Sequence, residues 1–150
     1  MFKHILIPTD GSPISIRAAK AAVTFAKDSG ARVTAYYCKD PLPRPVYGDS
    51  YIQDRRLAPE LERRANAAAR KCLVDVTRAA RKAGVQCQTL ANRAASPYEG
   101  IIEAAAKRKC DLVFIGTHGY RGLTRLAMGS VAEKVARLAK VPVMVYRPSA

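Results

Sequence analysis

The fold is decided by the stretch Gly116-Thr-His-Gly-Tyr-Arg-Gly-Leu-Thr-Arg-Leu-Ala-Met-Gly-Ser130. The apolar run 112–115 before it predicts a buried strand, and residues 131–138 after it predict an amphipathic helix. A glycine-rich segment that leaves a strand and enters a helix is typical of a phosphate site, because exposed backbone amides and the helix dipole favour an anion there. The alternative is that these glycines only form a long connection, and their spacing alone does not decide between the two.

A second suggestive segment follows the first strand of the chain. Residues 3–8 form an apolar run without polar alternation, which is typical of a strand covered on both faces. The run is followed by Thr9-Asp10-Gly11-Ser12-Pro13, in which Ser12 is a good N-cap and Pro13 suits the first helical position. We therefore expect a helix from Pro13 to about Ser29 that starts beside the end of the first strand.

The remaining segments alternate between strand and helix patterns. Such alternation predicts an α/β fold with a single open parallel sheet, right-handed crossovers and helices on both faces. Ligands of such sheets bind at the carboxyl ends of the strands where the strand order reverses, and we expect the first and fourth strands to be neighbours there. The other expected elements are a strand at 32–38, a proline-rich loop at 40–48, a helix at 57–83, a strand at 85–91, a helix from 97, a strand at 111–115, a helix from 131 capped by a box of Ser130 and Glu133, and a last strand at 141–146, which suits a sheet edge.

The composition is that of one globular domain spanning residues 1–150. Hydrophobic residues make up 49% of the chain, and no apolar run approaches the roughly 20 residues that cross a bilayer. The N-terminal apolar stretch is too short for a signal peptide, so we expect a cytoplasmic protein with no membrane partner. The four cysteines are far apart and form no C-x-x-C pair, which predicts reduced thiols rather than a zinc or redox site.

The net charge of +14 is the strongest departure from average composition. It predicts a positive field that attracts nucleotides, nucleic acid or an anionic membrane, although charge alone gives affinity without specificity. Nine of the basic residues fall between Arg55 and Lys82. A solvated helix face is the alternative explanation of this cluster, and we favour it over a DNA-reading element.

No familiar motif decides the chemistry of the glycine-rich loop. The P-loop, the dinucleotide fingerprint and the nucleophile elbow are all absent from the sequence. Asp10 is the carboxylate best placed to bind a ribose or help hold a metal, or alternatively it is a turn residue that accepts from the next backbone amides. Ser130 donates to a phosphate, caps the helix or does both, and His118 and Arg121 either meet phosphates or are solvated. Without a nucleophile and a base these residues favour binding over catalysis, so we assign no catalytic residue.

Three separated motifs make the sequence similar to the universal stress protein family over nearly its whole length. The first is Ile5-Leu-Ile-Pro-Thr-Asp-Gly-Ser12. The second is Asp111-Leu-Val-Phe-Ile-Gly-Thr-His-Gly119, which opens the spacing Gly116-x2-Gly119-x9-Gly129-Ser130 of the family's ATP-binding signature. The third is Gly129-Ser-Val-Ala-Glu-Lys-Val135, followed by Val141-Pro-Val-Met-Val145. The resemblance is weakest between residues 41 and 60.

This resemblance implies a Rossmann-like sheet of the adenine nucleotide α-hydrolase-like class with strand order 3-2-1-4-5. It also implies a homodimer through the last strand, Val141–Tyr146, and ATP, accompanied by Mg or Mn, lying across the first and fourth strands. The residues that it places around ATP are Pro8, Thr9, Asp10 and, by its backbone, Cys38 at adenosine, Ile115 and Gly116 in the pocket wall, and Gly119, Gly129, Ser130 and Val131 at the phosphates.

Three functional hypotheses follow from the sequence. We favour an ATP-binding regulatory protein of the stress response, whose protein partner the sequence does not name. The first alternative is a slow ATPase, although nothing in the sequence identifies a general base. The second alternative is a basic protein associated with nucleic acid, which predicts salt-sensitive binding that survives Gly119→Val, because phosphate contacts from surface Lys and Arg do not need the glycine loop.

Overall fold

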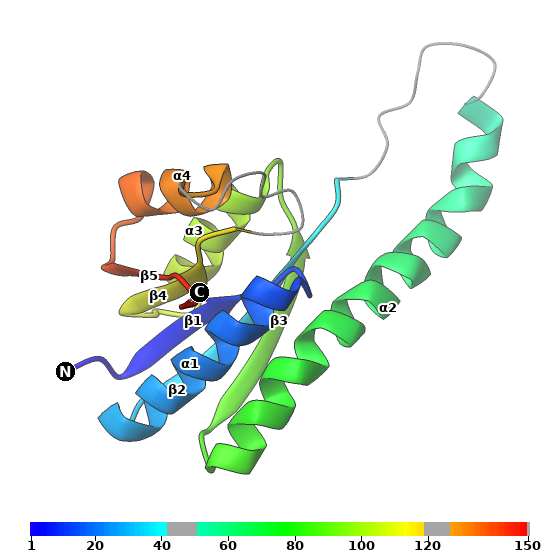
Figure 1. The fold of residues 1–150 in the computed structure, drawn as a ribbon. Helices are drawn as coiled ribbons and strands as arrows, with labels where there is room; N and C mark the ends of the chain where they lie inside the picture. Colours follow the sequence, from blue (N-terminus) through cyan, green and yellow to red (C-terminus); the bar gives the residue numbers. More distant parts are fainter. Residues whose placement is uncertain (42–50, 119–126, 150) are drawn as a thin grey trace.

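The computed structural model describes residues 1–41, 51–118 and 127–149, and of residues 51–56 the backbone only. Strands and helices alternate along the described chain, as predicted (Figure 1). None of the helices, as far as they are described, is both long and apolar enough to cross a membrane. In chain order the elements are β1 (His4–Pro8), α1 (Pro13–Ser29), β2 (Arg32–Lys39), α2 (Tyr51–Ala83), β3 (Cys87–Arg93), α3 (Pro97–Lys107), β4 (Leu112–Gly116), α4 (Ser130–Leu138) and β5 (Val143–Tyr146).

The five strands form one open parallel sheet in the order β3-β2-β1-β4-β5. This is the expected order, with β1 and β4 side by side near the centre. Every residue of these two strands is buried, because helices cover the sheet on both faces. Successive side chains of a strand point to opposite faces. Ile5 and Ile7 of β1 therefore pack against α1 and α2, whereas Leu6 packs against α3 and α4 (Figure 1).

Helix α1 begins and ends where the sequence predicts. The hydroxyl oxygen of Ser12 accepts a hydrogen bond from the backbone N–H of Ser15 at 3.2 Å, which caps the first turn. Gly30 ends the helix in the left-handed region at φ 67°, a conformation that glycine adopts without strain. The first turn of α1 lies against the end of β4, where Ile14 approaches Gly116.

Helix α2 begins at Tyr51 rather than near residue 57, so the predicted start is wrong. Pro59, which is typical of a first turn, lies inside this helix. The amino-terminal part of α2 projects beyond the sheet (Figure 1). Glu62 ties this part to the ends of β2 and β3, because its carboxylate pairs with Lys39 Nζ at 3.0 Å and with the guanidinium of Arg93.

Strands β5 and β3 form the two edges of the sheet. β5 starts at Val143, directly after Pro142, whose carbonyl oxygen accepts from the Val113 N–H at 3.0 Å. Proline has no N–H for a strand interior, which explains why the strand begins after it. β3 starts at Cys87 and lies at the other edge. The proline-rich loop expected at 40–48 lies outside the described residues, except for its first two positions.

Candidate functional site

The ladder between the two central strands ends early at the carboxyl edge of the sheet. Among the described residues β1 pairs with β4 as far as Leu6–Val113, whereas its pairing with β2 continues to Pro8. The next residue, Thr9, donates its N–H to the Tyr36 carbonyl oxygen of β2 at 2.9 Å. Successive residues of a strand direct their backbone polar groups to opposite neighbours, so Pro8 faces β4, where it has no N–H to donate. The missing donor stops the ladder where the strand order reverses.

The turn after β1 is held by its own side chains. Thr9 Oγ1 accepts from the Gly11 N–H at 3.1 Å and lies 3.1 Å from Ser15 Oγ. Asp10 Oδ1 accepts from the Ser12 N–H at 2.9 Å, which is the turn role considered as the alternative for this residue. Asp10 is nevertheless exposed at the sheet edge. The turn therefore presents a preformed polar surface beside the end of β1.

Strand β4 ends against α1 with little room for a side chain. A Cβ on Gly116 would stand 3.1 Å from Ile14 Cγ2, which is tighter than ordinary contact. The residue after the strand, Thr117, donates its N–H to the Tyr146 carbonyl oxygen of β5 at 2.9 Å. Ile115 and Gly116, both buried, thus form the β4 side of the edge next to β1.

Helix α4 begins at the same edge, and Gly129 is its N-cap residue. The Gly129 N–H donates to the Thr117 carbonyl oxygen at 2.6 Å, and a Cβ on Gly129 would stand 2.5 Å from that oxygen. Only glycine fits this approach. The predicted capping box of Ser130 and Glu133 is wrong, because Ser130 is already the first helical residue and the cap position belongs to Gly129.

The N-terminus of α4 presents backbone amides to its surroundings. The N–H groups of Ser130, Val131 and Ala132 have no partner within the helix, since intrahelical bonds begin with the Glu133 N–H. No side-chain hydrogen bond caps this end in the described part of the chain, whereas the Ser12 hydroxyl caps α1. Together with the positive end of the helix dipole, these amides suit an anion at α4 better than at α1.

Cys38 lies near the end of β2, one strand away from β1. Its half-buried side chain packs on the α3 side of the sheet, and burial raises the pKa of its thiol. Beside it the Tyr36 hydroxyl donates to Asn92 Oδ1 at 2.7 Å. Gly100 of α3 leaves space for that hydroxyl, because a side chain there would overlap it. The Cys38 side chain therefore belongs to the packing under α3 rather than to the open edge.

Most of the predicted site residues come together at one edge of the sheet. The three groups are Pro8, Thr9 and Asp10 after β1, Ile115 and Gly116 at the end of β4, and Gly129, Ser130 and Val131 at the start of α4. Their role toward a ligand stays a prediction. Gly119 and Arg121 lie outside the described residues, and within the described ranges no three His, Cys, Asp or Glu side chains gather into a metal site.

Thr117 is the residue that the sequence analysis missed. Its side chain is 3% exposed, and its backbone bonds both Tyr146 of β5 and Gly129 of α4. Two local signals mark it: it directly follows a buried strand, where the chain leaves the sheet, and it lies within the motif Asp111–Gly119. Its partners are fixed by the tertiary arrangement of β5 and α4, which no short pattern encodes.

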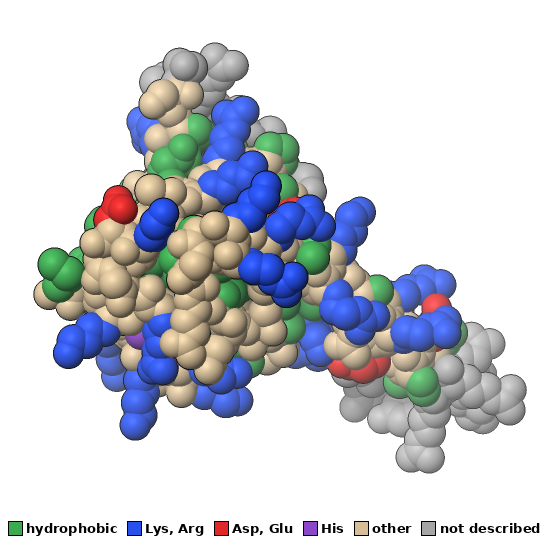
Figure 2. Space-filling view, turned by 90° about the horizontal axis from the view of Figure 1, so that it is seen from below, with side chains coloured by type: hydrophobic (Ala, Val, Ile, Leu, Met, Phe, Trp, Pro, Cys, Tyr) green, Lys and Arg blue, Asp and Glu red, His purple; other side chains and the backbone are tan. Residues whose placement is uncertain are grey.

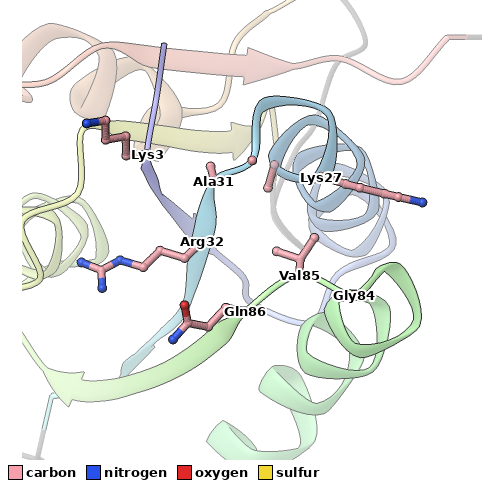
Figure 3. A pocket seen from close by; sticks show the side chains of 9 residues that line it. Lys3, Lys27, Ala31, Arg32, Gly84, Val85 and Gln86 are labelled. Atoms are coloured by element: carbon pink, nitrogen blue, oxygen red, sulfur yellow. The ribbon is translucent and has the colours of Figure 1, made fainter.

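A hollow of about 350 Å³ lies at the opposite, amino edge of the sheet. It is bordered by the ends of α1 and α2, at Gly30 and Gly84, and by the residues that begin the first two strands. The side chain of Lys27 points away from those of Lys3 and Arg32 there (Figure 3). Their charges therefore do not converge on a common ligand, and the glycine-rich edge remains the better candidate site.

The sequence as a whole matches one family over this same fold. The model of the universal stress protein family matches residues 1–147. This chain belongs to the universal stress protein family. A universal stress protein of Methanocaldococcus jannaschii is 37% identical to it over 150 residues, which cover 98% of this chain and 83% of that protein.

Solved structures of the universal stress protein family share the fold. The structure of UspA from Lactobacillus plantarum superposes with a TM-score of 0.76 at 26% identity, covering 97% of each chain. A family protein of Arabidopsis thaliana, solved with AMP bound, superposes with a TM-score of 0.68 at 15% identity. That likeness covers 99% of this chain and 93% of the Arabidopsis chain, so the similarity in fold is not confined to one segment.

Proposed function

We propose that this universal stress protein binds an adenine nucleotide, with ATP as the expected ligand, at the carboxyl edge of its sheet. The observation that carries the proposal is the start of α4, where the amides of Ser130 and Val131 are presented beside the reversal of the strand order. The phosphates would accept from these amides. Adenosine would extend past Pro8 and Asp10 toward the end of β2.

Two further observations support an adenine nucleotide. The Arabidopsis relative carries AMP within the same fold. The net charge of +14 favours an anionic ligand at any exposed site. A divalent cation, Mg or Mn, would arrive with the triphosphate, because phosphate oxygens and waters supply most of the ligands that Mg²⁺ prefers.

The sharpest test replaces one backbone donor and leaves the fold intact. Gly129 has φ −62° and ψ 150°, a conformation that a residue before proline readily adopts. Proline is also favoured at the first helical position, so Ser130→Pro should keep α4 while it removes the Ser130 N–H. Ser130→Ala is the matched control, because it removes the hydroxyl and keeps the amide. Substitution of Gly129 is unsuitable, since any side chain would collide with the Thr117 carbonyl.

Binding of ATP with magnesium is measured by isothermal titration calorimetry, and each variant is melted without nucleotide. We expect Ser130→Pro to weaken ATP binding by about 10- to 100-fold, the worth of one hydrogen bond to a charged group, without lowering the melting temperature. Ser130→Ala should lose much less affinity for ATP. Equal ATP affinity of Ser130→Pro and the parent would show that the phosphates do not bind at the start of α4. A parent that binds neither ATP nor AMP would overturn the proposal.

We also propose that a second copy of the chain pairs with β5. Val143–Tyr146 is an edge strand, and its residues are all half-buried in the single chain. Because Pro142 and Tyr146 accept from β4, the backbone groups of Val143 and Val145 point to the open side. An unpaired edge of this kind is a template for another strand.

A proline on the open side of β5 tests the dimer. Val145→Pro removes an outward N–H, and the bonds of β5 to β4 do not use that donor. We expect the parent to be a dimer and Val145→Pro to be a monomer in size-exclusion chromatography with light scattering. A monomeric parent at high concentration, or a variant that dimerises like the parent, would contradict pairing through β5.

Membership of the universal stress protein family supports a stress-response role for the proposed nucleotide binding. We propose a regulatory role, in which nucleotide occupancy changes the surface that the edge around α4 shows to a protein partner. The absence of an assigned nucleophile or base in the sequence keeps binding, rather than hydrolysis, as the proposed activity. Turnover of ATP at rates well above the spontaneous reaction, lost with the Ser130→Pro variant, would replace this role by an enzymatic one.

A further inference from the structure

A groove runs between α1 and α2, on the face of the sheet away from α3 and α4. Both helices line it, and its volume is about 480 Å³. Lys20 of α1 and Arg78 and Lys82 of α2 lie along it, and Val23 and Ala79 contribute apolar surface. The groove is therefore basic along both sides, with an apolar lining between the two helices.

The basic side chains of this α1–α2 groove have little internal compensation. Asp75 is the acidic residue that lines it, and its Oδ1 lies 3.9 Å from Arg78 Nη1, with both side chains substantially exposed. In the described part of the chain Lys20 and Lys82 make no ion pair. An exposed pair at such a distance contributes little, so the charges remain available to an external anion.

Further basic residues extend the charge of the groove. Lys27 lies two turns along α1 from Lys20, and Lys71 lies two turns before Arg78 on α2, both exposed. Seen from below, Lys and Arg side chains greatly outnumber Asp and Glu, and they continue toward the projecting end of α2 (Figure 2). Exposed basic residues thus continue along both helices beyond the groove.

We propose that the α1–α2 groove binds the phosphate backbone of a nucleic-acid duplex without reading its sequence. Lys and Arg are the residues that contact phosphates and fix a protein on a duplex. Among the described residues no aromatic side chain lines the groove, so these residues offer no stacking platform for the bases of a single strand. Uncompensated positive charge spread along two adjacent helices matches the repeated negative charge of a duplex backbone.

The lining of the groove favours a duplex over a membrane surface. None of the large hydrophobic side chains that are exposed in the described residues lines the groove. A helix that binds a bilayer surface inserts such side chains into the headgroup region. Attraction to anionic lipid by charge alone remains an outcome that the experiment separates.

The test removes charge from the groove and compares an equal loss elsewhere. The groove variant is Lys20→Gln, Arg78→Gln and Lys82→Gln, which keeps most of each side-chain stem. The matched control removes the same charge from exposed positions on and after α4, by Lys134→Gln, Arg137→Gln and Lys140→Gln. The probe is a short fluorescein-labelled DNA duplex of mixed sequence, and fluorescence anisotropy gives Kd from about 50 to about 200 mM NaCl.

Removal of one side chain that binds a phosphate should lower the slope of log Kd against log salt by about 1. We therefore expect the slope of log Kd against log salt to be lower by about 3 in the groove variant, and its affinity at the lowest salt to be at least 10-fold weaker. The control variant should keep most of the parental slope. Asp75→Asn should tighten binding, because it removes the carboxylate from the groove and leaves every cation. This gain cannot come from misfolding.

Three results would overturn the proposal. The first is an equal loss of duplex affinity in the groove and control variants, which would show that binding depends on net charge and not on the groove. The second is tighter binding to phosphatidylserine vesicles than to the duplex, with the vesicle affinity lost in the groove variant, which would assign the surface to a membrane. The third is no binding of the parent to the duplex at low salt. Ser130→Pro should leave duplex binding unchanged, so this proposal and the nucleotide proposal fail separately.

Discussion

His4 Nε2 lies 2.8 Å from the Thr34 hydroxyl oxygen in a buried contact between neighbouring strands. Burial is unusual for histidine, because its imidazole can take up a proton and become charged. His4 is 4% exposed, and burial, together with the charge of Arg32, lowers the pKa of its imidazole despite the opposing effect of Asp111. The folded protein therefore prefers the neutral ring. An imidazole whose pKa is lowered by folding destabilises the native state once the unfolded chain begins to bind the proton.

The first prediction is a loss of stability as the pH falls below about 6.5, the pKa of histidine in the unfolded chain. Above that pH the His4 imidazole is neutral in both the folded and the unfolded chain, so the protein has its full stability. In urea unfolding between about pH 7 and pH 5, the free energy of unfolding of His4→Gln should change less with pH than that of the parent. A parental slope in His4→Gln would assign the pH dependence to other groups.

The second prediction concerns the close approach of Gly129 to the Thr117 carbonyl. Gly129→Ala should destabilise the protein by about 1–3 kcal/mol, because the Cβ meets backbone atoms that cannot rotate away. The φ of −62° is acceptable to alanine, so strain in the torsion does not contribute. Urea unfolding at neutral pH measures the loss. Ser130→Ala changes the exposed neighbour, and its free energy of unfolding should stay within about 0.5 kcal/mol of the parent. Equal stability of the two variants would show that Gly129 does not need to be glycine for its approach to Thr117.

The third prediction uses the packing of Tyr36 against Gly100. Gly100→Ala should cost about 1–3 kcal/mol, since its Cβ overlaps the Tyr36 hydroxyl and crowds Cys38 Sγ at 3.2 Å. Tyr36→Phe should cost about 1 kcal/mol, because it removes the hydrogen bond to Asn92. The double variant should be more stable than the sum of the two losses predicts, as the overlapping oxygen is gone. Additive losses in chemical unfolding would show that the two residues do not interact.

The fourth prediction is local and concerns the tie between Glu62 and the strand ends. Glu62→Gln should speed amide hydrogen exchange in the part of α2 before residue 67, because Lys39 and Arg93 lose their carboxylate partner. Glu60→Gln is the matched control, since Glu60 pairs only with arginines of its own helix among the described residues.

The same tie should respond to pH in the parent. Hydrogen bonds from Arg93 and Lys39 lower the pKa of the Glu62 carboxyl, so the folded state favours its charged form. The stabilisation by the Glu62 ion pairs is fully present above pH 4.5, the ordinary pKa of a glutamate carboxyl in the unfolded chain. It is lost as the pH falls through the lowered pKa of Glu62 in the folded protein. Lower protection factors in α2 at low pH, after correction for the intrinsic pH dependence of amide exchange and absent from Glu62→Gln, are the expected result. Identical profiles would show that Glu62 does not hold the helix.

The elements of the fold were predictable where local signals mark their ends. Ser12 and Pro13 marked the start of α1, and Gly30 marked its end. The alternation of strands and helices predicted the parallel sheet and the adjacency of β1 and β4, while the complete strand order came from the resemblance to a family. The start of α2 was missed because Pro59 lies inside a helix, a position that its local preference opposes.

The site was less predictable, because its contacts join residues that are distant in sequence. A capping box at Ser130 and Glu133 fits the local pattern, but the approach of Gly129 to Thr117 moves the cap by one residue. The effect of Pro8 depends on which neighbouring strand its nitrogen faces, and that follows from the register with β2. Glu62 and Arg93 likewise meet only because the sheet and α2 place them together.

Thr117 gives two proposed binding events a common point in the chain. Its N–H is bonded to Tyr146 of β5, and its carbonyl oxygen is bonded to Gly129 at the start of α4. A nucleotide that repositions α4 and a second copy that repositions β5 would both displace this one residue. Thermodynamic linkage then requires reciprocity: any factor by which the nucleotide tightens the dimer is the factor by which dimerisation tightens the nucleotide.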